Sequence, residues 1–352
     1  MPVRIATFNV ENLMSRFDFG TDLHQLRREG AMNLFEIRDL ETFRDLEMAR
    51  RVAMTDDTRQ STALAIRDTK ADILCLQEVE SLSVLRNFEK HYLHRLVDMD
   101  YPWKRLIEGN DRRGIDVACL ARQNFAIAAR SHAGLTFDDL DLFNEDLNII
   151  GVNKSDRVFR RDCLELDTSV DGKPLTIYVC HFKSMGFRRE PGMPYPRRAS
   201  GRDLTRAVRA AEAGAVRKII ERRFGNNASD ANWVICGDLN DHLWVNGQPN
   251  TDSGLTPLVD DGFAVNLMDR APRKERWTHF YPKDNHVTQL DYILASQAIA
   301  DANPDAVPDM VRAGMPYRVP GIEKLERYPR IGWDRPKASD HCPMAVTLKM
   351  PK

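Results

Sequence analysis

Short apolar runs that end in polar side chains recur along this chain and predict buried β-strands. The plainest example lies within 233–241, where four apolar residues lead to Gly237 and then to Asp238 and Asn240. Side chains alternate along an extended segment, so Asp238 and Asn240 point the same way while Leu239 points back into the core. A buried strand therefore presents a carboxylate and a carboxamide together at its end.

Other predicted strands carry polar side chains at their edges in the same way. Each one alone also has an ordinary structural explanation, such as a turn, an acidic first turn of a helix or a structural histidine. Several such edges in one chain indicate a common site. The side chains concerned are Asn9, Glu78, His181, Asp291, Asp340 and His341.

Between the strands, helical periodicity predicts helices that cover a sheet. A hairpin turn is expected at 171–174, where Asp-Gly-Lys-Pro separates two alternating runs. The segment 125–129 is expected to pair with the strand at 115–120. Further ranges are expected as helices (81–94, 203–224 and much of 17–70) and as strands (103–106, 158–166, 175–180 and 344–348).

The 352 residues favour one domain over 1–352, with peripheral insertions near 14–60, 185–202 and 299–337. Hydrophobic residues make up 42% and charged residues 29%, and no apolar stretch reaches 18 residues, so a disordered or transmembrane chain is not expected. The N-terminus lacks the pattern of a signal peptide, and we expect a cytoplasmic protein. No protein partner can be inferred.

Charge and cysteine content narrow the chemistry further. The six cysteines form no CxxC pair and lie in or beside apolar runs, so we expect buried free thiols. The net charge of −1 gives no general attraction to polyanions. A local basic patch is expected in the loop 185–202 and the helix that follows, either as a phosphate-contacting surface or as a solvated one. Its arginines include Arg188, Arg189, Arg197, Arg198, Arg202, Arg206 and Arg209.

The ordered set of polar strand edges resembles the endonuclease/exonuclease/phosphatase superfamily, and the resemblance spans Phe8 to Val346. It implies a four-layer α/β sandwich: two mixed β-sheets packed face to face, with helices on the outer faces, as in deoxyribonuclease I. It also implies hydrolysis of a phosphoester by in-line attack of water. The phrases Thr7–Leu13, Arg113–Ala118 and His181–Ser184 look most like bacterial members described as nuclease-like.

The resemblance implies that Glu78 is the principal ligand of Mg²⁺ or Mn²⁺, helped by Asn9 and Asp340. Oxygen ligands suit such hard cations. It further implies that His341 is the general base and that Asp291 accepts the other ring proton of His341.

The remaining roles that the resemblance implies concern the phosphate. Asp238 would orient the attacking water or relay a proton, and Asn240 would hold the phosphate. His181 would contact the phosphate or protonate the leaving group. Arg161 matches a phosphate-binding arginine of some members more loosely.

Three functions remain open at this point. The first is a nuclease acting on DNA or RNA, favoured by the basic loop with its interleaved aromatic residues. The second is a phosphoesterase of a smaller substrate, such as a phospholipid headgroup, an inositol phosphate or a cyclic nucleotide. Asp241 and His242 replace the Tyr-Arg of inositol 5-phosphatases, which weakens that branch. The third is an inactive binding module.

Overall fold

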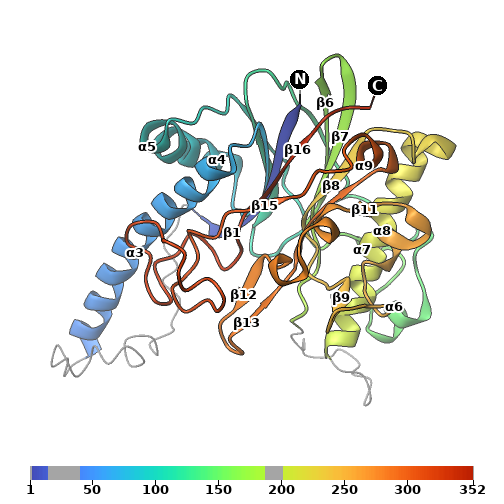
Figure 1. Cartoon of the computed structure of the whole chain (residues 1–352). Helices are drawn as coiled ribbons and strands as arrows, with labels where there is room; N and C mark the ends of the chain where they lie inside the picture. Colours follow the sequence, from blue (N-terminus) through green and yellow to red (C-terminus); the bar gives the residue numbers. More distant parts are fainter. Residues whose placement is uncertain (1, 15–39, 187–200, 352) are drawn as a thin grey trace.

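Two six-stranded mixed sheets pack face to face (Figure 1). The structure is a computed structural model that describes residues 2–14, 40–186 and 201–351. The first sheet has the order β15-β16-β1-β2-β4-β3, and the second has the order β11-β14-β8-β7-β6-β5. Only β1–β2 and β7–β8 pair in parallel among the paired strands of these two sheets in the described ranges.

The strands have the following bounds. The first sheet contains β1 (Val3–Leu13), β2 (Ile73–Val79), β3 (Trp103–Leu106), β4 (Asp116–Ala121), β15 (Asp309–Met310) and β16 (Met344–Leu348). The second contains β5 (Ala128–Ser131), β6 (Cys163–Val170), β7 (Lys173–His181), β8 (Trp233–Asp238), β11 (Val265–Asn266) and β14 (Asp291–Ala295). Two small hairpins are formed by β9 (Trp244–Val245) with β10 (Gln248–Pro249), and by β12 (His279–Tyr281) with β13 (His286–Thr288).

The main core lies between the two sheets. Ile5, Ile73 and Val117 from the first sheet meet Ile177 and Val234 from the second in one buried cluster. Full burial of an aliphatic side chain contributes roughly 1.5–3 kcal/mol. Face-to-face packing of the two sheets is therefore a principal source of stability.

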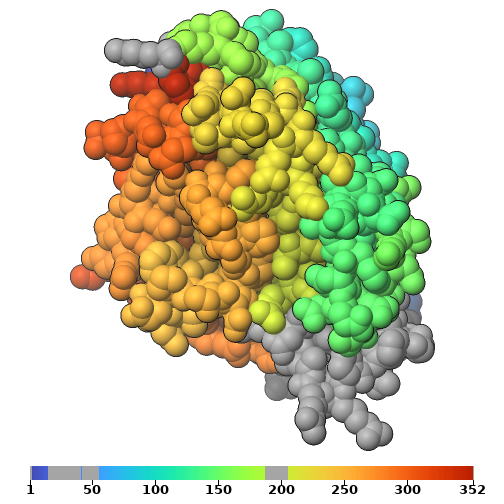
Figure 2. Space-filling view, turned by 90° about the vertical axis from the view of Figure 1, so that its right-hand side faces the viewer, coloured from blue at the N-terminus to red at the C-terminus, as the bar shows by residue number. Residues whose placement is uncertain are grey.

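Helices cover the outer face of each sheet. On the first sheet, Ala63 and Ile66 of α3 (Leu40–Thr69) and Leu85 of α4 (Leu82–Phe88) pack against strand residues. On the second, Val216 of α7 (Gly201–Phe224) packs in one cluster with Trp233. Figure 2 looks onto this second face, where the yellow segment with α7 and α8 lies beside the green segment with α6. The predicted four-layer sandwich is confirmed.

The other helical segments are short. The predicted helix over 81–94 is α4 followed by a π-helical turn, and the acidic segment around 138–146 ends in a short helix. The remaining elements are η1 (Glu89–His94), α5 (Arg95–Val97), α6 (Glu145–Ile149), η2 (Gly225–Asn227), α8 (Thr256–Val259), η3 (Asp260–Gly262), η4 (Leu267–Arg270), η5 (Arg273–Glu275) and α9 (Gln297–Ala302).

Two strand predictions were wrong. The segment 125–129 does not pair with β4; Phe125 and Ile127 enter the core, and the strand begins at Ala128 and pairs with β6 of the other sheet. The strand predicted over 158–166 begins only at Cys163. Before it, the backbone N–H of Arg160 donates to the Glu212 side chain instead of a strand neighbour. Periodicity reports which side chains are buried, such as Phe125, Ile127, Val158 and Phe159, and not which strand a segment pairs with.

The cysteine prediction is confirmed. All six are buried free thiols; five lie on strands of the two sheets, and Cys342 precedes β16. Cys75, Cys119 and Cys236 meet in the core between the sheets, while Cys163 and Cys180 are direct neighbours on β6 and β7. Among the described helices, none combines the length and the apolar character that a membrane crossing requires.

Candidate active site

Three polar side chains form one row across the second sheet. β7 and β8 run parallel with His181 opposite Asp238, and β8 and β14 run antiparallel with Asp238 opposite Asp291. Residues directly opposite on neighbouring strands project to the same face. The strand register therefore places the imidazole and the two carboxylates side by side.

Gly237 permits the close approach of β7 and β8 beside this row. Its φ is 149°, and a Cβ built there would lie 1.9 Å from the carbonyl oxygen of Cys180. A side chain does not fit at that distance. Any other residue would push the two strands apart next to His181 and Asp238, so the glycine is part of what positions the row.

Asn9 joins the row to the first sheet. Its Nδ2 donates to Asp238 Oδ2 at 3.1 Å, and its Oδ1 accepts from the backbone N–H of Glu11 at 3.1 Å. The backbone N–H of Asn240 donates to the other oxygen of Asp238, Oδ1, at 3.0 Å. Both oxygens of the Asp238 carboxylate are thus fixed by hydrogen bonds.

Asp238 lies between two histidines in a buried position. Its Oδ2 is 3.5 Å from His181 Nε2 and 3.9 Å from His341 Nε2. Burial raises the pKa of Asp238 to about 7, and the charges of Asp291 and Glu78 act in the same direction, against those of His341 and the Asn9 hydrogen bond. This carboxyl group therefore exchanges its proton near neutral pH.

His341 and Asp291 form a buried pair. His341 Nδ1 lies 2.8 Å from Asp291 Oδ2, and Ser339 Oγ accepts from the His341 backbone N–H at 3.0 Å. Burial alone would lower the pKa of His341, but the charges of Asp291, Asp238 and Asp340 outweigh it and raise the pKa to about 10. With Asp291 accepting at Nδ1, His341 presents Nε2 toward Asp238.

Glu78 and Asp340 bring two carboxylates together on the other side of the site. Glu78 has a left-handed backbone with φ of 68°, and its Oε2 accepts from the Asn12 N–H at 3.0 Å. Burial raises the pKa of Glu78, and the negative charge of Asp340 raises it further. Two carboxylates that repel each other are oxygen donors that a hard divalent cation prefers, and Asn9 on the neighbouring strand β1 carries a further amide oxygen, so the residues present fit Mg²⁺ or Mn²⁺.

Glu11 positions Asp340, a role that the sequence did not reveal. Glu11 Oε2 accepts from the Asp340 backbone N–H at 2.9 Å and from Lys337 Nζ at 2.8 Å, and Oε1 accepts from Arg335 at 2.8 Å. Burial opposes ionisation of Asp340, but Lys337 and His341 lower its pKa to about 2. Asp340 is therefore ionised throughout the ordinary pH range.

His279 is a second side chain that sequence reasoning missed. Its Nε2 lies 4.0 Å from Asp340 Oδ2, and its ring centroid is 4.6 Å from that of His341. Burial and then the charge of His341 lower the pKa of His279 to about 3, so the imidazole is neutral. One ligand atom each from His279, Asp340 and His341 lie within 4.8 Å of one another, a spacing suited to a metal ion. A backbone bridge to His341, which the sequence does not reveal, brings His279 to the site.

Arg161 and Asn240 converge on the carbonyl of Phe182. Arg161 Nη1 donates to this oxygen at 2.6 Å and Asn240 Nδ2 at 3.2 Å, while Arg161 Nε donates to Asp111 Oδ2 at 2.9 Å. Burial, and then the charge of Arg161, hold the pKa of the adjacent His181 well below its ordinary value. His181 is therefore a neutral hydrogen-bonding group at neutral pH.

The helix α7 holds the loops that follow β7 and β8. Glu212, which is fully buried, accepts from the backbone N–H groups of Arg160 and Lys183 at 3.0 and 2.7 Å. Arg209 pairs with Asp241 at 2.8 Å and is 1% exposed. The expectation that Arg209 belongs to an open basic face was therefore wrong, because the loop after β8 covers it.

The other arginines of the predicted basic patch have separate outcomes. Arg188, Arg189, Arg197 and Arg198 lie outside the described residues, as does the side chain of Arg202. Arg206 is partly exposed and pairs with Asp252 at 3.4 Å. The structure thus brings together the predicted acidic and histidine residues, and the arginine patch stays a prediction.

Three solved structures share this fold. Truncated Caenorhabditis elegans TDP2 is 14% identical, with 99% of this chain and 98% of that chain covered and a TM-score of 0.53. The human Nocturnin catalytic domain is 13% identical (99% and 94%, TM-score 0.51), and a Bacteroides thetaiotaomicron mannosyl-6-phosphatase is 12% identical (99% and 100%, TM-score 0.51). At these identities the likeness concerns the fold alone.

Sequence comparison identifies the group to which the chain belongs. No curated protein matches it. The family model described as Endonuclease/Exonuclease/phosphatase family matches residues 6–341. That range includes every residue of the row and of the carboxylate pair. The chain is a member of the endonuclease/exonuclease/phosphatase family, whose enzymes hydrolyse phosphoric esters and generally depend on divalent metal ions.

Proposed function

We propose that this protein is a divalent-metal-dependent phosphodiesterase that hydrolyses DNA or RNA by in-line attack of water. The observation that carries the proposal is the position of Asp238, a buried carboxylate held between His181 and His341 with both of its oxygens hydrogen-bonded. In-line hydrolysis requires a group that accepts the proton of water and positive charge on the phosphate oxygens. Both requirements meet around this carboxylate.

Asp238 is the better candidate for the proton acceptor. The family resemblance implied this role for His341, but the carboxylates around His341 raise its pKa and favour the protonated imidazolium, whereas the raised pKa of Asp238 makes its carboxylate a stronger proton acceptor. A general base works best when its pKa lies near the operating pH. His341, kept cationic by Asp291, then stabilises negative charge on the phosphate.

The remaining residues hold the phosphate in this proposal. His181 is neutral, which suits a hydrogen bond to phosphate better than protonation of the leaving oxygen. Asn240 and Arg161 lie beside His181, where both side chains donate to the carbonyl oxygen of Phe182. Glu78, Asp340 and Asn9 would hold Mg²⁺ or Mn²⁺, which supplies positive charge to the phosphate oxygens when bound.

Exposed aromatic side chains favour a nucleic-acid substrate. Tyr281 lies on the hairpin β12–β13 that also carries His279, and it is 44% exposed. Tyr317 and Trp333 are 43% and 69% exposed, and with Arg318 they line a neighbouring hollow of about 610 Å³. Solvent-exposed aromatic rings next to a guanidinium are typical platforms for unstacked bases.

A smaller phosphoester is the second candidate. The net charge of −1 provides no general attraction to a polyanion. One solved structure of the same fold is described as a mannosyl-6-phosphatase. A sugar phosphate, a lipid headgroup or a cyclic nucleotide therefore belongs in any test of substrate.

The test is a metal-dependent screen with the Asp238→Asn variant as blank. Linear and nicked DNA, RNA, phosphoinositides, sphingomyelin and bis(p-nitrophenyl) phosphate are offered with Mg²⁺ or Mn²⁺. We expect turnover of nucleic acid that disappears in the blank and on chelation. Turnover confined to small esters would replace the nucleic-acid proposal with the second candidate.

Salt dependence separates the two candidates independently. Nucleic-acid affinity should fall steeply with salt because counterions are released, whereas a small substrate should show little slope. Neutralising Arg197, Arg198 and Arg202 together should flatten that slope. An unchanged slope would exclude these arginines from the phosphate contacts.

A further inference from the structure

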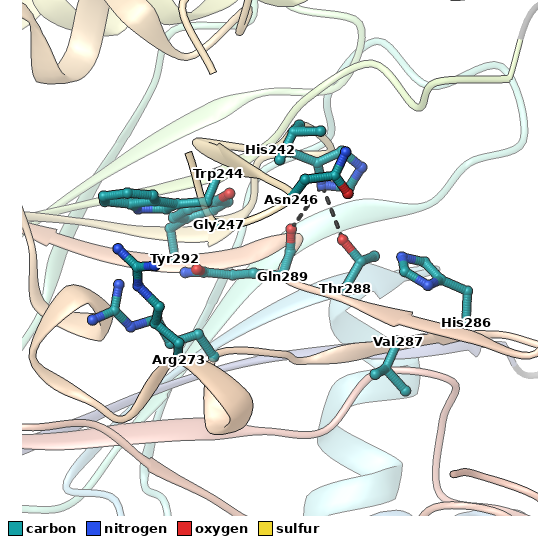
Figure 3. A pocket seen from close by; sticks show the side chains of 12 residues that line it. His242, Trp244, Asn246, Gly247, Arg273, His286, Val287, Thr288, Gln289 and Tyr292 are labelled. Carbon is teal, nitrogen blue, oxygen red and sulfur yellow. Dashed lines mark hydrogen bonds between the residues drawn. The ribbon is translucent and has the colours of Figure 1, made fainter. Parts of the chain in front are cut away.

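A cavity of about 460 Å³ lies beside the catalytic row (Figure 3). The β9–β10 hairpin, the start of η5 and the strand β13 surround it. Its wall includes Trp244 and Arg273 on one side and His286 on the other. A volume in this range is typical of sites for small ligands, and it accommodates a group the size of one nucleotide.

The cavity and the active site share the hairpin β12–β13, since β13 lines the cavity and β12 carries His279. Thr288, in the cavity wall, is the direct strand partner of His279. Thr288 Oγ1 and the Gln289 carbonyl oxygen lie 3.0 and 3.2 Å from His242 Nδ1, as the dashed lines in Figure 3 show. Gln289 Nε2 in turn donates to the Asp291 backbone carbonyl at 3.3 Å. The wall of the cavity is therefore built on the same segments that carry His279 and Asp291.

The cavity wall is positively charged. It contains two arginines and two histidines, and no carboxylate occurs among its lining residues. Arg276 is already engaged, because it donates to Asp269 Oδ1 at 3.3 Å and to the Ala271 carbonyl at 2.8 Å. Asp269 is thereby paired with Arg276 and also accepts from the Trp244 indole N–H.

Arg273 differs from Arg276 in having no such partner. Within the described part of the chain its guanidinium makes no hydrogen bond or ion pair, and it lies 5.7 Å from the Trp244 ring centroid. The indole supports the guanidinium from one side and leaves its N–H groups for a ligand. A free guanidinium in a cavity without carboxylates favours an oxyanion, and phosphate above all, because two parallel hydrogen bonds form.

We propose that this cavity binds a second phosphate of the substrate, adjacent to the phosphate that is hydrolysed, and that Arg273 is its main contact. The inference rests on the proposed phosphodiesterase activity. The second phosphate belongs either to the neighbouring nucleotide of a chain or to a small molecule with two phosphate groups. In both cases the cavity selects a doubly charged substrate over a single ester.

The kinetic test compares substrates that differ only in one phosphate. The chain arm uses the dinucleotides TpT, pTpT and TpTp, and the small-molecule arm uses thymidine 5′-(p-nitrophenyl phosphate) with and without a 3′-phosphate. Arg273→Gln should lower kcat/KM about tenfold for a substrate with the second phosphate and leave bis(p-nitrophenyl) phosphate unchanged. Lys274→Gln is the matched control, because it removes the same charge one residue away and does not line the cavity.

A binding measurement keeps the inference independent of turnover. Calorimetric titration of the metal-free protein with thymidine 3′,5′-bisphosphate should show about tenfold weaker binding in Arg273→Gln, with thymidine 5′-monophosphate unaffected. Equal effects on both ligands, or on all kinetic substrates, would overturn the cavity assignment. Absence of phosphodiester turnover in the wild type, with the binding difference intact, would overturn the proposed function alone.

Discussion

The two sheets supply the active site in different ways. The second sheet contributes His181, Asp238 and Asp291 as direct neighbours in a regular ladder, and the strand register alone places them. The first sheet contributes its groups where β1 departs from regular pairing: the register shifts between Asn9 and Leu13. Glu78, on β2 of the same sheet, has a left-handed backbone conformation with φ of 68°.

This difference separates two tasks. A regular ladder holds neighbouring side chains at a fixed spacing, which suits proton transfer and a fixed phosphate. Left-handed residues and a bulge turn side chains away from the ladder, so that Glu78 can lie near enough to Asp340 for the two carboxylates to repel each other. We therefore expect substitutions in the second sheet to affect turnover and substitutions in the first to affect metal binding.

The largest effect is expected from Asp238→Asn. The amide cannot accept a proton from water, and kcat should fall on the order of 10³-fold with the fold retained. Turnover on bis(p-nitrophenyl) phosphate and the thermal midpoint provide the measurements. Asp252→Asn, at a carboxylate that is 88% exposed, is the control and should stay at the wild-type rate. Activity within a few-fold of wild type would remove Asp238 from the reaction.

The second-largest effect is expected from Glu78→Gln. Its effect on the stability of the protein has opposite signs with and without metal. Without metal, the variant should be at least as stable as the wild type, because repulsion from Asp340 disappears. With metal at about 100 times the dissociation constant, the wild type should gain about 2.7 kcal/mol and the variant much less. Thermal denaturation with and without Mg²⁺ measures both.

The control for Glu78 is the exposed Glu326→Gln, which removes a carboxylate far in sequence from the site. It should leave both the metal-free midpoint and the metal-induced shift as they are in the wild type. An identical metal shift in Glu78→Gln would show that Glu78 holds no cation.

The pH profile distinguishes the two candidate bases. If Asp238 accepts the proton, kcat/KM rises about tenfold per pH unit below pH 7, levels off above it, and declines as His341 loses its proton near pH 10. Initial rates between pH 5 and 10 in Mg²⁺ provide the profile. A steady rise up to pH 10 would instead assign the base to His341.

The smallest effect is expected from His279→Ala. An imidazole near Asp340 favours Mn²⁺ over Mg²⁺, because Mn²⁺ accepts nitrogen ligands more readily. The variant should lose a few-fold in apparent Mn²⁺ affinity and little in Mg²⁺ affinity, as measured by metal activation curves. His91→Ala, at an exposed helical position, is the control. An equal change for both metals would assign His279 a purely structural role.

The sequence could predict the ladder residues because each ends or begins an apolar run. Asp238, His181 and Asp291 are recognisable from burial followed by polarity, and the register that joins them follows from parallel and antiparallel pairing. The four-layer architecture was predictable for the same reason, since it requires only apolar strands and amphipathic helices.

Other residues could not be found in this way because their role depends on a partner distant in the chain. Arg209 lies on the polar face of an amphipathic helix, which the sequence alone predicts to be exposed. In the folded protein the loop after β8 covers this position, and Arg209 forms a buried ion pair with Asp241. Glu212 likewise binds two loops that lie 29 and 52 positions away. His279 joins the site through one bridge to His341. Periodicity gives no information on such partners.

The six buried thiols allow the opening of the core to be measured. Cys75, Cys119 and Cys236 lie in the seam between the sheets, and the other three are buried as well. A thiol reagent can reach the space between the sheets only when the sheets separate. The labelling rate of Cys75, Cys119 and Cys236 therefore reports how often the sheets open. Labelling with and without Mg²⁺ would then show whether occupation of the catalytic edge closes the seam behind it.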